Sequence, residues 1–376
     1  MDSKNFSRRN FIQKGALAGI ATTTIIGNGF GRSNKPSITD KKGTATFNYP
    51  SSATKKLTEL LNVKYPIIQA PTGGVVNSSF TAAVANSGGL GALPLSWSEP
   101  DYAIKQIEAI KGKTKNPFFA NFVLNFEPKA FDVAIASGVP IIQFSWGMPT
   151  KDMVAKMKEA KVILGIQVTS EASARAALDL GADYLICQGT EAGGHVHASR
   201  PLAEALQRVL KIAGDIPVVA SGGIATGHKM REYMQMGAAG VVMGSRFVAT
   251  IESGAHDVYK KSLVASAAED TVFTTCMNKG FENTTHRILR NSTFEMWESA
   301  GCPAVGERPG EKDIVVQFGP DYDVERYSIN APNLNYTGEI EAMANYAGTS
   351  VNDIHDIPTV AELIGRIWSE FKEQQH

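Results

Sequence analysis

Apolar and polar positions alternate along this chain with two different periods. Short apolar runs rich in β-branched or aromatic residues follow a Gly or a Pro, and such runs predict buried strands. Between them lie longer stretches in which apolar residues recur three and four positions apart, as on one face of a helix. We predict strands at Pro66–Ala70, Leu90–Leu95, Pro117–Val123, Pro140–Phe144, Val162–Val168, Tyr184–Gln188, Pro217–Ala220 and Gly240–Met243.

The longer stretches predict the helices that connect these strands. The segment Glu171–Leu180 illustrates the signals: Thr169 and Ser170 precede it as N-terminal caps, and Gly181 follows it as a C-terminal stop. We predict helices at Ser79–Asn86, Asp101–Lys111, Ala130–Ala136, Lys151–Ala160, Glu171–Leu180, Leu202–Ile212, Gly227–Met236 and Val360–Phe371.

Eight strands, alternating with helices, follow one another within residues 53–252. Strands that are apolar on both faces are typical of a parallel sheet covered by helices, and eight such units close a (β/α)8 TIM barrel. The alternative is an open doubly wound sheet, which would carry its nucleotide-binding glycines directly after the first strand. Here the phosphate-type glycines come late, at Gly222 and Gly244, so the sequence favours an α/β fold of the barrel type.

Residues 253–376 are less regular than the barrel units. Gly280–Asn291 is polar, Gly301–Gly310 is rich in breakers, and Val360–Phe371 is amphipathic. We predict a mainly helical C-terminal subdomain that covers the substrate over the barrel mouth, with the final helix packed against the barrel.

The N-terminus has the pattern of a twin-arginine export signal. Arg8 and Arg9 precede Phe11, and a run of small apolar residues follows from Gly15 to Gly29. That run is shorter than the about 20 residues of a membrane span, so no stable span is expected. We predict a signal peptide over residues 1–30, a polar linker over 31–52 and an exported, periplasmic protein; an ordinary basic tail is the alternative.

The charge and the cysteine content of the chain limit which partners and which disulfides are expected. Lys and Arg together number 37, as do Asp and Glu, so the net charge is zero and no nucleic-acid partner is expected. Cys187 lies inside a predicted strand. A disulfide between Cys276 and Cys302 stays open, because an exporting route would permit it but no close spacing supports it. A homodimer also stays open.

Two glycine-rich segments follow the seventh and eighth predicted strands, where TIM barrels commonly hold a phosphate. Glycines let backbone amides approach phosphate oxygens, and a serine hydroxyl adds a donor. The alternative is that these glycines only make tight turns. We predict a phosphate site at Ser221, Gly222, Gly223, Gly244 and Ser245.

The loop after the sixth strand runs from Gln188 to His195 and ends in Gly193, Gly194 and His195. The two glycines would let the backbone pass close to a flat ring, and His195 would then project into the barrel mouth. We predict a catalytic role for His195, against the alternative of a structural or solvent-facing histidine. His197 lies close by, but no third ligand is evident, so no metal is expected.

Side-chain amides recur near the strand ends. An amide both donates and accepts, so a ring of amides suits the pyrimidine edge of a flavin, although each could also be a satisfied core group. No dinucleotide-type or Walker-type glycine motif is present. The amides are Gln69, Asn121, Gln143, Gln167 and Gln188.

These motifs resemble the nitronate monooxygenase family, formerly called 2-nitropropane dioxygenases. The resemblance spans roughly residues 60–370 and implies a TIM barrel with non-covalent FMN. Thr72 stands where that family usually has Met. The segments that carry the resemblance are Pro66–Pro71, Asn121, Gln188–His195, Ala220–Ile224, Gly237–Phe247, Ala255–Lys260, Arg287–Asn291 and Tyr346–Val351.

The resemblance also implies roles for single residues. His195 would be the catalytic histidine, and the glycines after the last two strands would hold the FMN phosphate. The full set implied to contact the cofactor is Ala70, Pro71, Thr72, Asn121, Gln167, Gln188, Gly193, Gly194, Ser221, Gly222, Gly223, Gly244 and Ser245.

The reaction implied is the oxidation of an alkyl nitronate, or of a nitroalkane, by FMN and O2 to a carbonyl compound and nitrite. His195 would act as the base or would bind the anion. One alternative is an NAD(P)H-dependent flavin reductase of the quinone or enoyl-thioester type on the same barrel. A non-catalytic flavin-binding protein is a further alternative.

Overall fold

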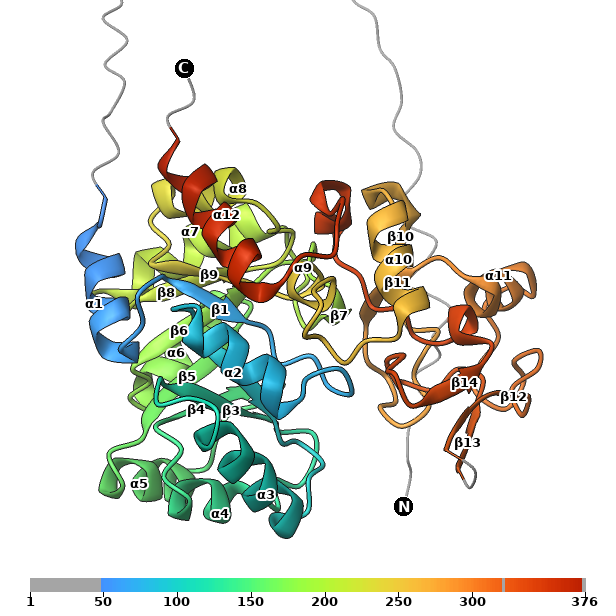
Figure 1. The fold of residues 1–376 in the computed structure, drawn as a ribbon, viewed down its shortest axis with the longest axis horizontal. Helices are drawn as coiled ribbons and strands as arrows, with labels where there is room; N and C mark the ends of the chain where they lie inside the picture. The colour runs from blue at the N-terminus through green and yellow to red at the C-terminus, as the bar shows by residue number, and fades with distance from the viewer. Residues whose placement is uncertain (1–48, 320–321, 374–376) are drawn as a thin grey trace, which may run out of the picture. The chain divides into compact units, whose positions relative to one another are not determined.

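Eight parallel strands form one sheet in the computed structural model, which describes residues 49–319 and 322–373 (Figure 1). The sheet closes on itself where Ile68 bridges Leu90, whose amide donates to the Ile67 carbonyl oxygen at 2.9 Å. The predicted barrel is therefore confirmed. Its strands are β1 (Ile67–Gln69), β2 (Gly91–Pro94), β3 (Phe118–Val123), β4 (Ile141–Ser145), β5 (Ile163–Val168), β6 (Tyr184–Gln188), β8 (Val218–Ser221) and β9 (Gly240–Met243).

Helices cover the outside of this sheet. The signals at α6 act as predicted, because Ser170 caps the helix by accepting from the amide of Ser173, and Gly181 follows it with φ +80°. The covering helices are α2 (Ser78–Asn86), α3 (Pro100–Lys111), α4 (Phe131–Ala136), α5 (Lys151–Glu159), α6 (Glu171–Asp179), α7 (Leu202–Ala213) and α8 (Gly227–Gln235).

A helix that the periodicity did not reveal, α1 (Ser52–Leu61), closes the amino-terminal end of the barrel. Its Leu57 and Leu61 are buried against the barrel interior, where they join a cluster that contains Ile68 and Tyr184. This packing fills one end of the barrel and leaves the carboxyl ends of the strands as the end where a ligand can enter.

The C-terminal region combines the expected helices with short antiparallel strands that the sequence did not predict. Its strands have three to five residues and pair antiparallel in small sheets, and such short segments give no clear periodicity. The short helix α9 (Ser245–Val248) directly follows β9 and precedes this region. The region itself contains α10 (Asp257–Ala265), β10 (Thr271–Thr274), β11 (His286–Leu289), α11 (Ser292–Ser299), β12 (Ile314–Phe318), β13 (Tyr322–Glu325) and β14 (Tyr336–Gly338).

One strand joins the C-terminal region to the barrel loop that carries the predicted histidine. β7 (Gly194–His195) pairs antiparallel with β11, so that His195 lies opposite His286 and Gly194 opposite Arg287. The order of this small sheet is β10-β11-β7. Residues far apart in the sequence therefore set the position of His195.

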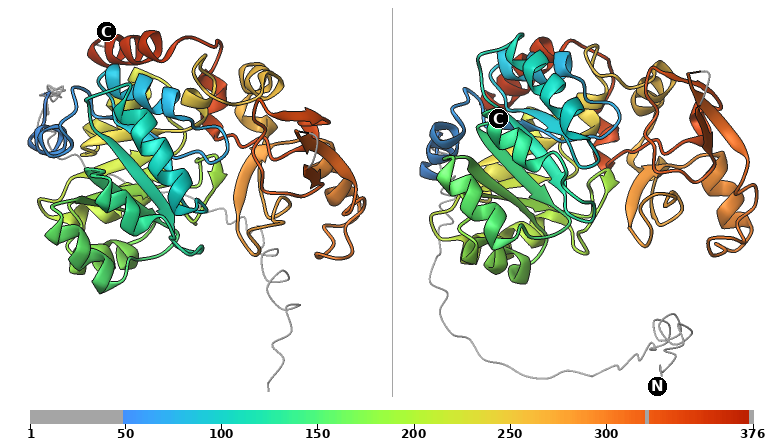
Figure 2. Two further views of the ribbon diagram at one scale, coloured as in Figure 1. Left: turned by 60° about the horizontal axis from the view of Figure 1, so that its bottom comes forward. Right: turned by 90° about the horizontal axis from the view of Figure 1, so that it is seen from below.

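The final helix, α12 (Val360–Lys372), returns to the barrel and packs against α8, as predicted (Figures 1 and 2). Gly227, the first residue of α8, permits this approach, since a Cβ there would overlap the carbonyl oxygen of Ile367. The Glu370 carboxylate accepts a 2.7 Å hydrogen bond from the Gly227 amide. Side chains of α12 such as Ile364 and Phe371 are buried in the core shared with the barrel helices.

The predicted signal peptide and all but the end of the predicted linker lie outside the described residues. Cys187, Cys276 and Cys302 are all free thiols, so the structure contains no Cys276–Cys302 bridge. Within residues 49–319 and 322–373, no helix has both the length and the apolar content needed to cross a bilayer.

Candidate active site

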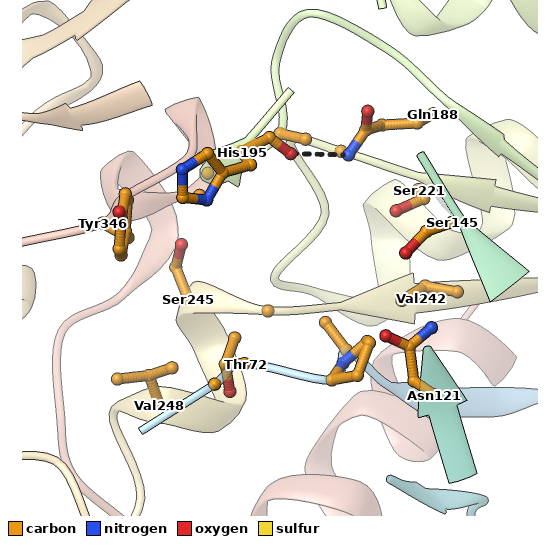
Figure 3. Close-up of a pocket in the computed structure, with 18 of the residues that line it drawn as sticks. Thr72, Asn121, Ser145, Gln188, His195, Ser221, Val242, Ser245, Val248 and Tyr346 are labelled. Carbon is orange, nitrogen blue, oxygen red and sulfur yellow. Dashed lines mark hydrogen bonds between the residues drawn. The ribbon is translucent and has the colours of Figure 1, made fainter. Parts of the chain in front are cut away.

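A pocket opens at the carboxyl ends of the barrel strands, and about 1310 Å³ of space free of protein atoms lies within it and its mouth. The barrel contributes strand ends, and the C-terminal region contributes Phe281. It also contributes Tyr346, which lies beside His195 (Figure 3). All the residues that the resemblance assigned to catalysis or to the cofactor line this pocket: Ala70, Pro71, Thr72, Asn121, Gln167, Gln188, Gly193, Gly194, His195, Ser221, Gly222, Gly223, Gly244 and Ser245.

The glycine segments after β8 and β9 form a cradle with unpaired amides. Gly222 and Gly223 have φ values of +122° and +67°, which glycine adopts at little cost. In the described chain, the amides of Gly223 and Gly244 have no hydrogen-bond acceptor. The Ser245 hydroxyl oxygen accepts from the Gly348 amide at 3.0 Å, which leaves its own proton free to donate. This donor set suits a phosphate.

Two buried amide atoms in the pocket lack partners. The Gln143 Oε1 acceptor and the Gln167 Nε2 donor are buried without a hydrogen bond in the described structure. Asn121 donates through Nδ2 to the Gln143 carbonyl oxygen at 3.2 Å. Because an unpaired buried polar atom costs about 1–3 kcal/mol, a ligand that donates to one amide and accepts from the other would be favoured. A flavin pyrimidine ring has both kinds of group.

The side-chain amides of Gln69 and Gln188 form hydrogen bonds with backbone groups of the chain. Gln69 is fully buried outside the pocket, and its Oε1 accepts from the Ala92 amide at 2.9 Å. Gln188 lines the pocket, but its Oε1 accepts from the His197 amide at 2.9 Å and its Nε2 donates to the His195 carbonyl oxygen at 3.4 Å (Figure 3). Gln188 thus holds the His195 strand in place.

The glycines before His195 also have an unexpected partner. A Cβ on Gly193 would lie 2.6 Å from the carbonyl carbon of Ala347, so this glycine makes room for the C-terminal segment. Gly348 makes the reciprocal approach, since a Cβ there would lie 2.7 Å from the Glu191 carbonyl oxygen. Gly193 therefore makes a backbone-to-backbone contact within the chain, and the expected passage of the loop beside a flat ring stays a prediction.

His195 lies on β7 among aromatic rings. The centroid of its imidazole is 4.8 Å from that of Phe281 and 5.3 Å from that of Tyr346. Its Nε2 is buried and has no hydrogen-bond partner among the described residues. Burial, and to a lesser degree His286, lowers the pKa of His195 to about 3. The ring is therefore neutral at physiological pH.

His286 supports His195 from the neighbouring strand, with ring centroids 5.7 Å apart. Its Nε2 accepts from the Met277 amide at 3.0 Å, so the proton is on Nδ1, which faces the Thr284 carbonyl oxygen at 3.3 Å. Burial lowers the pKa of His286 to about 4. The sequence did not identify this histidine, because only the β7–β11 pairing brings it to the site.

The sequence also did not predict the aromatic side chains that line the pocket. Trp97 and Trp146 come from loops after β2 and β4, and Phe281 comes from a loop before β11. Irregular loops have no periodic pattern that would place such rings. The ring of His197 stacks on Trp146 with centroids 4.8 Å apart.

Fold and pocket together define a (β/α)8-barrel enzyme whose site combines a phosphate-type cradle with a neutral histidine. The chain belongs to the nitronate monooxygenase family, whose profile matches residues 54–134 and 124–370. The family resemblance seen in the sequence is thereby confirmed, and so is an oxidoreductase enzyme.

Individual relatives support the same class. A probable nitronate monooxygenase of Staphylococcus saprophyticus is 32% identical over 278 residues, which cover 61% of this chain and 78% of that protein. The structure of a FabK from Thermotoga maritima matches with a TM-score of 0.69 and 29% identity, over 84% of this chain and 96% of that one. The structure of a nitroalkane oxidase from Streptomyces ansochromogenes matches with a TM-score of 0.67 and 25% identity, over 84% of this chain and 97% of that one.

Proposed function

We propose that this protein is an FMN-dependent enzyme that oxidises alkyl nitronates, or nitroalkanes, with O2 to a carbonyl compound and nitrite. One observation carries the proposal: the unpaired, buried Nε2 of a neutral His195 lies in the same pocket as the glycine cradle. The family match and the likeness to a nitroalkane oxidase support it.

The donor set of the pocket fits FMN. The amides of Gly223 and Gly244 and the Ser245 hydroxyl would hold the phosphate, and Gln143 and Gln167 would meet the ring. FMN bound there would supply the electron-accepting chemistry and the reaction with O2, while the chain supplies position and electrostatics.

His195 would meet the reacting carbon or the nitro group. A neutral imidazole can take the proton from the carbon next to a nitro group, and the resulting imidazolium then lies beside the anion it has created. It can also donate a hydrogen bond to an oxygen of a nitronate. Phe281 and Tyr346 cover the ring and limit its contact with water.

The test is product formation by the purified flavin-loaded protein. With ethyl nitronate and O2, we expect nitrite and acetaldehyde in equal amounts, and His195→Asn should lower kcat/KM at least a hundredfold while it keeps its flavin. His355→Asn, at an exposed position, is the matched control. A protein without flavin, or one that releases no nitrite, would refute the proposal.

A second candidate is an NAD(P)H-dependent flavin reductase, which the likeness to FabK favours. Anaerobic mixing with NADH separates the two functions. Fast loss of the flavin absorbance with NADH, together with no response to a nitronate, would establish the reductase instead.

We infer that the protein is exported, on the strength of Arg8, Arg9 and the apolar run that follows them. In cell fractionation the intact protein should reach the periplasm, and Arg8→Lys with Arg9→Lys should retain it in the cytoplasm. An unchanged distribution in that double variant would refute the inference.

A further inference from the structure

The pocket is electrically neutral. Among the described residues that line it there is no Lys, Arg, Asp or Glu. Two charged side chains in or beside the loop that carries His195 bind backbone groups instead: the Glu191 carboxylate accepts from the Leu202 amide at 2.9 Å, and Arg287 donates to the Thr190 carbonyl oxygen. A second charge on a substrate would therefore find no partner in this pocket.

An aromatic mouth, which we define as Trp97, Trp146 and Phe281, lines the same pocket, and Phe126 packs against two of its rings. Trp97 stacks on Phe126 with centroids 5.1 Å apart, and Phe126 contacts Phe281 at 4.9 Å. The ring centroid of Phe281 lies 5.2 Å from that of Trp146 and 4.8 Å from that of His195. Trp97 is 58% exposed, so part of this apolar surface stays open to a ligand. The aromatic mouth thus leads from solvent directly to His195.

The backbone of one of these aromatic residues, Trp146, is strained. Trp146 has φ +58°, a left-handed conformation that is an outlier for a bulky residue. Strain of this kind persists where the surrounding structure fixes a side chain for function. Here the indole is fixed between Phe281 and the ring of His197, which stacks on it with an interplanar angle of 12°.

We propose that the substrate's non-reacting part is uncharged and planar, and that it binds against the aromatic mouth beside His195. The site would then select aryl-substituted nitro compounds over those that carry a carboxylate. This inference rests on the proposed function for the identity of the reacting group.

Two physical effects support this selectivity. A carboxylate that enters a neutral, largely apolar pocket loses its hydration without gaining a counter-ion. A planar ring gains offset or edge-on contacts with Phe281 and Trp146 in addition to the burial of its area. Both effects favour the uncharged aryl group.

Binding of two unreactive ligands tests the inference without any turnover. Nitrobenzene and 4-nitrobenzoate differ only in the carboxylate, and titration calorimetry with the holoenzyme gives the affinity of each. We expect nitrobenzene to bind at least tenfold more tightly. Phe281→Ala should weaken the binding of nitrobenzene about tenfold. Phe318→Ala, on β12 outside the pocket, should leave that affinity unchanged. Trp97→Ala, at an exposed site, should also weaken nitrobenzene and keeps the test valid if Phe281→Ala fails to fold.

Equal affinity for the two ligands, or an affinity for nitrobenzene that neither mouth variant changes, would overturn the inference. A parallel turnover test compares the nitronates of phenylnitromethane and of 3-nitropropionate, and we expect the former to have the higher kcat/KM. If neither is oxidised while the binding preference holds, the proposed function fails and the aryl-binding mouth remains. If the carboxylate-bearing nitronate is preferred, the inference fails and the proposed function remains.

Discussion

At the scale of single residues, the neutral state of His195 is the feature with the largest chemical consequence. Its burial beside Phe281, Tyr346 and His286 removes water from the ring and so disfavours the charged form. A general base must be unprotonated in the free enzyme, and this one is unprotonated far below neutral pH.

The pH profile follows from that pKa. For a neutral nitroalkane, kcat/KM reports the free enzyme, so titration of His195 should lower it only as the pH falls towards about 3. Between pH 5 and 9 we expect no inflection that depends on His195. Steady-state nitrite release measures this profile. An inflection near pH 6.5 that disappears in His195→Asn would contradict the burial argument.

The glycine contact between Gly193 and Gly348 gives a second prediction at this scale. A methyl group in Gly348→Ala would lie 2.7 Å from the Glu191 carbonyl oxygen and 2.8 Å from the Gly193 amide nitrogen, so the loop before His195 must shift. We expect at least a tenfold lower kcat/KM with nitronate and a weaker hold on the flavin, measured as flavin retained after dialysis.

Gly365 is the matched control for that substitution. It lies on the exposed side of α12, and a Cβ there would meet no heavy atom within 4 Å. Gly365→Ala should retain flavin and gain about 0.5–1 kcal/mol of stability, because alanine loses less backbone entropy in a helix. Equal flavin loss in both variants would contradict the loop mechanism.

At the scale of elements, the two-residue strand β7 owes its existence to its pairing with β11. This ladder places two uncharged histidines, the half-buried His195 and the buried His286, next to each other. In the unfolded chain both bind protons below about pH 6.5, whereas in the folded chain they bind them only near pH 3 to 4. Folding stability should therefore fall as the pH drops from about 6.5 towards 4.

His286→Gln tests that linkage. Between pH 7.5 and 5, a histidine with this pKa contributes about 2 kcal/mol to the loss of unfolding free energy, and the variant should lose correspondingly less. Urea denaturation at the two pH values measures the difference. His355→Gln, at an exposed position, should leave the pH dependence unchanged. An unaltered slope in His286→Gln would show that this histidine titrates normally in the folded protein.

Elements differ in how far the sequence could predict them. The barrel strands and helices were predictable because each is a continuous segment whose periodicity and capping lie within itself, as at α6 with Ser170 and Gly181. β7 and β11 were not, since their pairing joins distant residues. The helix α1 was missed because its apolar residues Leu57 and Leu61 stand among polar ones beside the expected linker.

The residues of the candidate site likewise divide into those with a local sequence signal and those placed by distant contacts. The cradle glycines and His195 were predictable from their positions after the barrel strands. The partners that fix the site come from the C-terminal region, and no local signal indicates that Gly348 contacts Gly193 or that Phe281 contacts His195. The role of Gln188 as a support for the histidine strand likewise depends on contacts that only the folded chain reveals.

At the scale of the whole molecule, two parts of the chain share the site. The barrel provides the cradle and the strand-end amides, and the C-terminal region provides the covering rings and the strand that holds His195. α12 then returns to α8, so the region that covers the pocket is attached to the barrel on both sides in sequence. Cofactor binding and substrate covering should therefore be lost together when the C-terminal region is disrupted.

The most direct test of the central claim is rapid anaerobic mixing of the flavin-loaded protein with a nitronate, followed through the flavin absorbance. We predict that the absorbance is lost with ethyl nitronate faster than with NADH, returns when air is admitted, and is lost at least a hundredfold more slowly in His195→Asn. An absorbance that NADH removes and the nitronate does not, or a rate that His195→Asn leaves unchanged, would contradict this account.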